Sequence, residues 1–341
     1  MSEKISMKDV ANKAGVSVST VSRVLNNGNY ITEETKEKVE AAVKELNYRP
    51  NVIARGLRTK KTNSVGLILP DITNEFFGKL AKSIESVLND NGFNLLLCNS
   101  NEDAETERKY IEALLDKSVD GLIFISSGFD ENMELFPGDM PIVVIDRKPN
   151  TDKKIHFISS ENEKGGYIAT KHLIENGCKN IIMLKDQKLV SPMTARLKGH
   201  KRALKDYNLK FNPDFVIESK VELEEIHEKI LKNHNNLEFD GIFAGADRLA
   251  IGAIRTLSKL GYKIPEEIQI VGFDNIPFSE YYNPSITTVA QQIEKIGEKS
   301  SKLLIDLING KKPLDKSESL YFPVYLIKRE TTRWNPILNL E

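Results

Sequence analysis

The segment Ala11–Arg23 reads Ala-Asn-Lys-Ala-Gly-Val-Ser-Val-Ser-Thr-Val-Ser-Arg and decides the fold of the amino-terminal part of the chain. Small Ala14 and Gly15 permit a tight turn between two helices that pack at a steep angle. Ser17 can cap the second helix, because a serine oxygen at this position accepts a hydrogen bond from a backbone N–H of the first turn. The segment therefore predicts two short helices joined by a turn.

The flanking residues complete a small three-helix domain. Ser6 precedes an apolar-periodic run and Asp9 follows it by three residues, which predicts a capped first helix that begins there and ends at Gly15. Thr32 begins a third helix. The residues predicted to face inward are Met7, Val10, Ala11, Ala14, Val21, Val24, Leu25, Val39, Ala42, Val43 and Leu46. Another kind of three-helix domain is the alternative, although the turn signature is fairly specific.

The outward side of the second helix and the charge of this region both suit a nucleic acid. The side chains on that side, three short ones and an arginine able to fork onto a guanine, are Val18, Ser19, Ser22 and Arg23. Residues 1–61 contain 12 Lys and Arg against 7 Asp and Glu, a net charge of +5, whereas the remainder carries −6. A basic head on an acidic body is typical of a protein that binds a polyanion.

The head resembles the DNA-binding domain of the lactose-repressor family of bacterial transcription regulators, and the similarity continues through nearly the whole chain. It includes the stretch Tyr-Arg-Pro-Asn-Val-Ile-Ala-Arg-Gly-Leu at residues 48–57. The resemblance implies that residues 51–57 become a short helix only on the operator and that a pair of leucines matching Leu57 wedges into the minor groove, which kinks the duplex. An ordinary linker leucine is the alternative. The DNA contacts implied besides the four named above are Ser6, Ser17, Thr20, Asn26, Tyr48, Asn51, Ala54, Arg55 and Leu57.

Length and composition indicate a globular protein of several parts. The 341 residues exceed what one core usually holds, and 40% hydrophobic with 28% charged residues is the balance of a soluble protein. Apolar runs stay far below 18 residues and residues 1–10 have no hydrophobic signal region, so we expect a cytoplasmic protein without a membrane partner. Cys98 and Cys178 form no metal or redox motif and are expected to be reduced and structural. Neither a metal nor a cofactor is expected.

The body alternates apolar strands with helices, which predicts an α/β fold of two doubly wound parallel-sheet lobes. Strands are predicted at 65–69, 93–98, 121–125, 141–145, 181–184, 215–217, 241–243 and 268–271, and helices at 77–88, 110–115, 165–175, 196–207, 223–231 and 249–260. The resemblance implies a periplasmic-binding-protein-like body whose chain crosses between lobes near Ser159, Ala290 and Pro323. The predicted divisions are a head (1–48), a hinge (49–61), an N-terminal lobe (62–159 plus 292–322), a C-terminal lobe (160–290 plus 323–335) and a tail (336–341).

Polar residues follow the predicted strands, where ligands bind in such folds. They are Asp71, Asn74, Asp146, Arg147, Asp247 and Asp274, together with Arg196, which opens a helix after an irregular-looking stretch at 191–194. Carboxylates and arginines suit the hydroxyl groups of a sugar, and Phe76 and Phe77 can pack on its C–H faces. Each residue also has an ordinary structural interpretation: the aspartates can be caps, Asp247 above all, and the phenylalanines can belong to the core.

The pattern is similar to that of ribose-binding members of the superfamily. The matching elements are Asn74-x-Phe76-Phe77, Asp146-Arg147, Ala195-Arg196-x-x-Gly199, Gly272-Phe273-Asp274 and Thr288-Val-Ala-Gln291, which adds Gln291 to the site. One position departs, because Ala246 stands where ribose binders usually carry asparagine. A pentose such as ribose is favoured, and a different sugar or a sugar phosphate stays open.

An enzyme is not expected, because the sequence lacks a Gly-x-Gly pair and the motifs of the common catalytic folds. A transport receptor would need an export signal and no DNA-binding head. The resemblance implies a repressor of a sugar-utilisation operon that a sugar between the lobes releases from a palindromic operator. A regulator helped by a phosphorylated carrier protein and a corepressor type are the alternatives. A dimer is expected, since the tail after Arg333 is too short for the leucine heptads of tetrameric relatives.

Overall fold

The computed structural model of the chain describes residues 5–25, 31–48, 61–234 and 237–333. Contacts between residues divide it into a head, Met1–Thr62, and a body, Asn63–Glu341. The predicted hinge, residues 49–61, lies outside the described residues except for residue 61. None of the helices within the described ranges has the length and apolar character needed to cross a bilayer.

The head contains the three predicted helices, α1 (Met7–Ala14), α2 (Val18–Leu25) and α3 (Glu33–Glu45). The predicted caps are present. The backbone N–H of Ser6 donates to Asp9 Oδ2 at 2.8 Å, and that of Thr20 donates to Ser17 Oγ at 3.1 Å. Gly15 ends α1 with φ of +66°, a left-handed conformation that glycine adopts without steric cost.

The helices of the head enclose a small apolar core. Its buried members are Val10, Ala11, Val21, Val24, Val39, Ala42 and Tyr48. Six of these were predicted to face inward, and Tyr48 adds an aromatic ring at the end of the domain. The head therefore has a core of its own, built from residues close together in sequence.

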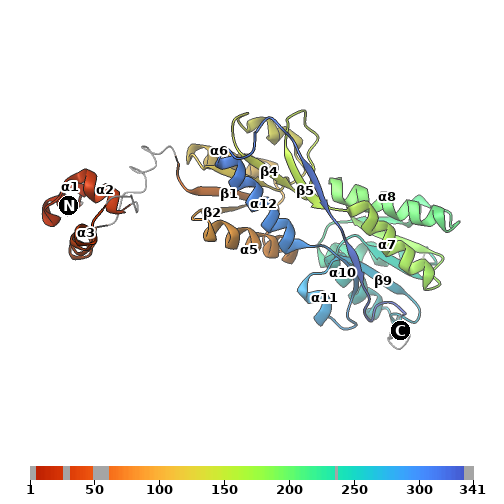
Figure 1. The fold of residues 1–341 in the computed structure, drawn as a ribbon. Helices are drawn as coiled ribbons and strands as arrows, with labels where there is room; N and C mark the ends of the chain where they lie inside the picture. The colour runs from red at the N-terminus through yellow and green to blue at the C-terminus, as the bar shows by residue number, and fades with distance from the viewer. Residues whose placement is uncertain (1–4, 26–30, 49–60, 235–236, 334–341) are drawn as a thin grey trace, which may run out of the picture. The chain divides into compact units, whose positions relative to one another are not determined.

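The body contains two six-stranded sheets (Figure 1). The first consists, in order across the sheet, of β2 (Asn94–Asn99), β1 (Ser64–Leu69), β3 (Gly121–Phe124), β4 (Ile142–Ile145), β5 (His156–Ser160) and β11 (Ser319–Phe322). The second consists of β7 (Val216–Ser219), β6 (Ile181–Asp186), β8 (Gly241–Ala244), β9 (Gln269–Asp274), β10 (Thr287–Ala290) and β12 (Tyr325–Ile327). All neighbours are parallel except β10 and β12.

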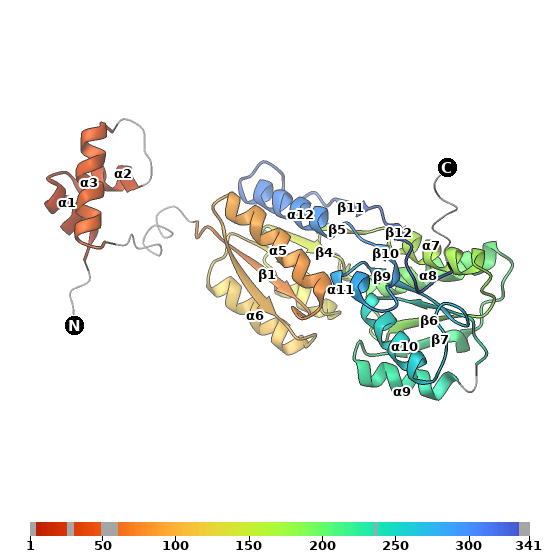
Figure 2. The same cartoon turned by 90° about the horizontal axis from the view of Figure 1, so that it is seen from below.

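Helices cover both faces of each sheet (Figure 2). The first sheet lies between α5 (Glu75–Asp90) with α12 (Ile293–Ile308) and α6 (Ala104–Asp116) with the 3₁₀ helix η1 (Asp130–Leu135). The second lies between α7 (Asn162–Glu175) with α8 (Ser191–Asp206) and α9 (Leu223–His234) with α10 (Asp247–Lys259). The short elements η2 (Pro213–Phe215) and α11 (Pro277–Tyr281) complete the fold. The predicted α/β class with two parallel-sheet lobes is confirmed.

The chain passes between the two sheets three times, after β5, after β10 and after β11 (Figure 1). Because three connections join the two lobes, the lobes can rotate against each other through changes of backbone angle at a few residues in these connections. The exact residue bounds predicted for the lobes remain a prediction.

Several elements were not predicted, and one prediction was wrong. The strands β5 and β10 were missed because His156-Phe-Ile-Ser-Ser and Thr287-Thr-Val-Ala are short and half polar, and α12, β11 and β12 were missed as well. The irregular stretch expected at 191–194 is the first turn of α8, where Pro192 is tolerated because the first N–H groups of a helix have no intrahelical partner.

Candidate DNA-contacting surface and ligand cleft

The second helix of the head presents an exposed face, but with one residue fewer than predicted. Val18, Ser19 and Arg23 are exposed, and Val18 keeps 44% of its surface. The prediction that Ser22 points outward is wrong: Ser22 is 9% exposed, because it follows Val21 around the helix toward α1 and α3. Arg23 is thus the cation on this face that remains free to meet a base edge or a phosphate.

The other predicted DNA contacts divide into three groups. Ser6 and Ser17 are exposed while their hydroxyls take part in the caps of α1 and α2, and Thr20 is half-buried. Tyr48 is 8% exposed and packs in the core of the head, which gives it a structural role. The remaining residues lie outside the described ranges: Asn26, Asn51, Ala54, Arg55 and Leu57.

A cavity of about 440 Å³ opens between the carboxyl ends of the strands of the two sheets. Nine of the ten residues predicted to contact a ligand line it, namely Asp71, Asn74, Phe76, Phe77, Asp146, Arg147, Arg196, Asp274 and Gln291. They come from both sheets, so a ligand that fills the cavity touches both lobes. The sequence pattern therefore located the wall of the cavity, although whether each residue binds a ligand remains a prediction.

Arg196 organises the second-lobe side of the cavity. Its Nε donates to Asn162 Oδ1 at 2.8 Å, its Nη1 donates to the Gly245 carbonyl at 2.5 Å, and its Nη2 lies 3.5 Å from Asp274 Oδ1. The guanidinium also lies 3.6 Å from the centre of the Phe273 ring, a cation–π contact. Fixed by these contacts, the guanidinium can donate to a ligand without first losing much rotamer freedom.

The carboxylates beside Arg196 are buried and carry an energetic penalty when charged. Burial raises the pKa of Asp274 to about 6, although Arg196 and the hydrogen bond from Gln291 Nε2 at 2.7 Å act in the opposite direction. Burial likewise raises the pKa of Asp146. Hydroxyl groups of a ligand that donate to these oxygens would replace the water lost on burial, which is the chemistry that a polyol provides.

Arg147 faces Arg196 from the first lobe. It follows β4, its Nη1 donates to the Ser126 carbonyl at 3.2 Å, and its guanidinium lies 5.5 Å from the centre of the Phe77 ring. Phe76 and Phe77 are 4% and 3% exposed and belong to the core of the first lobe, yet they also line the cavity. The structural and functional interpretations of these two rings are therefore compatible.

The prediction that Asp247 lies in the cleft is wrong. It is fully buried at the first position of α10, where Oδ1 accepts from Thr288 Oγ1 at 2.6 Å and Oδ2 accepts from the Ile276 N–H at 2.9 Å. A residue at the start of a helix can turn back toward the preceding layer, and here it joins α10 to the loop after β9 and to β10. Asp247 thus holds in place the loop that follows Asp274, through its hydrogen bond with the Ile276 N–H, and does not itself line the cavity.

Asp247→Asn is expected to change the pH dependence of stability. Burial, and next the charge of Asp274, raise the pKa of Asp247 to about 8, so the folded state favours the protonated form. The protonated Asp247 side chain contributes its full stabilisation of the folded state below the pKa that aspartate has in the unfolded chain, about 4. This contribution is lost as the pH rises toward 8. Asparagine does not titrate, so the free energy of unfolding of the variant should rise relative to that of the wild type by about 1.4 kcal/mol per pH unit between pH 4 and 8. Urea unfolding from pH 4 to 9 measures the difference, and parallel stability curves would contradict the assignment.

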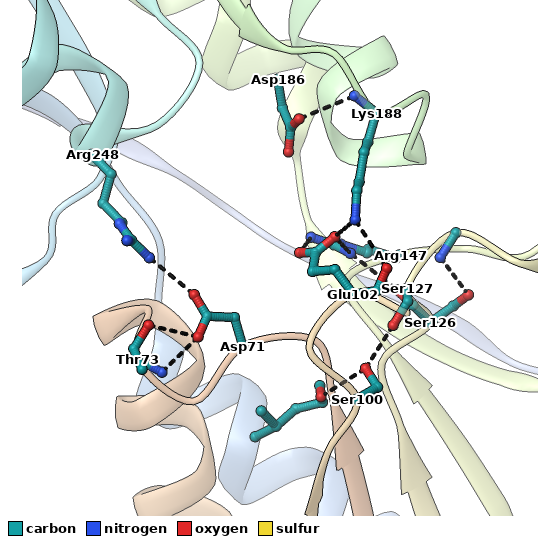
Figure 3. A network of polar contacts seen from close by, with 12 residues as sticks. Asp71, Thr73, Ser100, Glu102, Ser126, Ser127, Arg147, Asp186, Lys188 and Arg248 are labelled. Atoms are coloured by element: carbon teal, nitrogen blue, oxygen red, sulfur yellow. Dashed lines mark hydrogen bonds and ion pairs between the residues drawn. The ribbon is translucent and has the colours of Figure 1, made fainter. Parts of the chain in front are cut away.

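Charged residues that the sequence analysis missed also line the cavity and pair across it (Figure 3). Arg248 Nη1 of α10 lies 3.0 Å from Asp71 Oδ2 after β1, and Lys188 after β6 contacts Glu102 after β2. Burial alone would raise the pKa of Asp71, but hydrogen bonds from Thr73 and the pairing with Arg248 lower it. The remaining missed polar or charged lining residues are Asn101, Asp186, Gln187, Lys220 and Glu222. Most of the missed residues lie at or just after the ends of strands, and charged residues are too common there for sequence alone to select these ones.

Comparison with known proteins agrees with this architecture. Residues 6–51 match the family described as "Bacterial regulatory proteins, lacI family", and residues 62–330 match "Periplasmic binding proteins and sugar binding domain of LacI family". The chain is 41% identical over 330 residues to the ribose operon repressor of Halalkalibacterium halodurans, covering 96% of this chain and 97% of that protein.

Two solved structures resemble the chain closely. The lac repressor dimer bound to operator and the anti-inducer ONPF superimposes with a TM-score of 0.86 at 26% identity, covering 97% of this chain and 99% of that one. A LacI family transcriptional regulator from Enterococcus faecium with bound ribose gives a TM-score of 0.70 at 30% identity, covering 79% and 98%. These relatives are transcriptional regulators and not enzymes. The chain therefore belongs to the LacI family of bacterial regulatory proteins and is a DNA-binding transcriptional repressor with a ligand-binding body.

Proposed function

We propose that the protein represses a sugar-utilisation operon and that a small neutral sugar, a pentose such as ribose, releases it from DNA. The observation that carries this proposal is the cavity lined by both lobes, in which buried carboxylates and guanidinium groups stand together. Asp274 and Arg196 lie on one side, Asp146 and Arg147 on the other, and the rings of residues 76–77 add an apolar wall. Such a site accepts and donates hydrogen bonds to adjacent hydroxyls and packs on C–H faces.

Contact with both lobes supports a switch. A ligand shifts an equilibrium only if its affinity differs between the two states, and a ligand held from both lobes binds the closed body better than the open one. We infer that closure alters the spacing of the heads in a dimer, so that the hinges around residues 52–57 no longer pair on a palindromic operator. A coupling of about 1 to 3 kcal/mol, or about 5- to 150-fold in affinity, is usual for such switches.

Two relatives favour a pentose. One is named a ribose operon repressor, and the other is a family member with bound ribose. Ala246 also lines the cavity, and its methyl group offers no hydrogen bond to a sugar hydroxyl. Ribose would therefore make one contact fewer here than in a binder with asparagine at this position, which leaves room for a close relative of ribose. Because the target is chromosomal DNA, we place the protein in the cytoplasm.

Operator binding by the full-length protein tests the proposal. An operator selected from a random palindromic library should bind the dimer, with fluorescence anisotropy as the readout, and ribose should weaken binding by about 5- to 150-fold. Arg23→Ala should cost about 1 to 3 kcal/mol and relax preference at one operator position, because it removes a base contact, while ribose affinity stays unchanged.

Other outcomes separate the alternatives. A sugar that tightens operator binding would indicate a corepressor. A purified protein that binds its operator weakly and ignores every pentose would favour a regulator that needs a protein partner. Sedimentation of a stable tetramer, or of a monomer at micromolar concentration, would contradict the dimer.

A further inference from the structure

Glu102 holds one cation from each lobe inside the wall of the cavity (Figure 3). Its Oε1 accepts from Arg147 Nη2 at 3.0 Å and its Oε2 from Arg147 Nη1 at 3.4 Å, a two-pronged contact within the first lobe. Lys188 Nζ of the second lobe contacts Glu102 Oε2 and also donates to the Glu102 carbonyl at 3.3 Å. A single carboxylate thus bridges the two lobes through two cations.

This bridge is ionised and partly shielded from solvent. Burial acts to raise the pKa of Glu102, but Arg147 and Lys188 outweigh it and lower the pKa below the ordinary glutamate value. The side chain of Arg147 is 9% exposed and that of Glu102 is 24% exposed, so bulk water screens the pair little. The carboxylate therefore remains a fixed negative charge within the cavity at neutral pH.

The other cations of the cavity wall are matched in the same way. Arg196 lies beside Asp274, and Arg248 lies beside Asp71. Lys220 Nζ lies 3.9 Å from Glu225 Oε2. A ligand that carries a phosphate would need at least two cations to balance its charge, yet each of these five guanidinium or ammonium groups already faces a carboxylate. A polyol needs only donors and acceptors, which such paired groups still offer.

We propose that Glu102 is a specificity-determining residue that occupies, between Arg147 and Lys188, the place an anionic group of a ligand would take. The cavity consequently admits neutral polyhydroxyl ligands and excludes their phosphorylated forms. The inference rests on the proposed sugar-binding function and narrows its ligand class. Because Lys188 reaches Glu102 from the opposite lobe, Glu102 pairs with both cations only when the lobes are closed.

Inorganic phosphate tests the role of Glu102 without a sugar. Full-length wild type and variants are titrated with phosphate at constant ionic strength, set with sodium chloride, and binding is followed by thermal shift and calorimetry. Glu102→Gln frees both cations, so its phosphate affinity should exceed that of the wild type by about tenfold or more. Glu102→Asp keeps the negative charge and should bind phosphate no more tightly than the wild type does. Glu112→Gln, which removes an exposed carboxylate of α6, controls for net charge.

A comparison in the wild type keeps the proposal testable if Glu102→Gln does not fold. Ribose 5-phosphate should bind the wild type at least about tenfold more weakly than ribose. Wild type that binds phosphate or ribose 5-phosphate as well as Glu102→Gln does, or a folded Glu102→Gln without any gain, overturns the proposal. A gain by Glu102→Gln in a protein that ignores ribose would uphold the role of Glu102 while contradicting the pentose assignment.

Discussion

Arg196→Ala is expected to abolish sugar binding while operator binding persists, which yields a repressor that no longer responds to its effector. The guanidinium is buried, lines the cavity and lies beside Asp274. Its loss removes charge-assisted hydrogen bonds to the ligand, each worth about 1.5 to 3 kcal/mol, so affinity should fall by about a hundredfold or more. The DNA-contacting head has its own core and should be unaffected.

The substitution also leaves buried carboxylates without their cation, which destabilises the body by about 3 to 5 kcal/mol. Thermal unfolding should accompany titration calorimetry and operator-binding assays, all at low temperature. Arg202→Ala is the matched control, because Arg202 lies on the same helix but is exposed and paired with Glu163 at 2.9 Å. Sugar affinity that survives in folded Arg196→Ala would remove Arg196 from the site.

Gly199→Ala is expected to destabilise the body by about 3 kcal/mol and to weaken sugar binding at the same time. The helices α7 and α8 approach so closely that a Cβ on Gly199 would lie 1.9 Å from the Glu163 carbonyl oxygen and 2.6 Å from the Tyr167 nitrogen. Both atoms belong to the backbone, so the helices must separate. Because Arg196 lies one turn earlier on α8, its guanidinium would move away from Asp274.

Gly138→Ala provides the control. Gly138 is exposed, and nothing lies within 4 Å of the position that a Cβ would take, so its substitution should leave both stability and ligand affinity unchanged. Urea unfolding and calorimetry on the two variants measure the contrast. If Gly199→Ala unfolds at the same urea concentration as the wild type, the close approach of α7 and α8 does not contribute to the stability of the body as we expect.

Local sequence determined the head almost completely. The caps of Ser6, Ser17 and Thr32, the left-handed Gly15 and the apolar period all act within a few residues of chain, so their geometry follows from short-range sterics and hydrogen bonding. Ser22 was the exception. Whether it points into the core or out of it depends on how far α2 rolls against its neighbours, and local periodicity does not fix that angle.

The sequence also determined the class of the body and most of its cavity. Continuous apolar strands between helices require parallel sheets covered on both faces, and parallel strands bring their carboxyl ends to one edge. Asp71, Asp146 and Asp274 could therefore be assigned to a common site before any contact was known. The half-polar strands β5 and β10 escaped because the strands on both sides of each, β4 and β11 for β5 and β9 and β12 for β10, supply the apolar surroundings that their own residues do not signal.

Only the tertiary structure decided which charged groups meet. Asp247 lies near the carboxyl end of a strand, as Asp274 does, yet packing of α10 against β9 and β10 turns it away from the cavity. Glu102 and Lys188 are 86 residues apart in sequence and belong to different lobes, so their contact depends on the relative placement of two sheets. Propensity and periodicity act over a few residues, whereas the pairing of charges across a cleft is set by how the two lobes of the body close on each other.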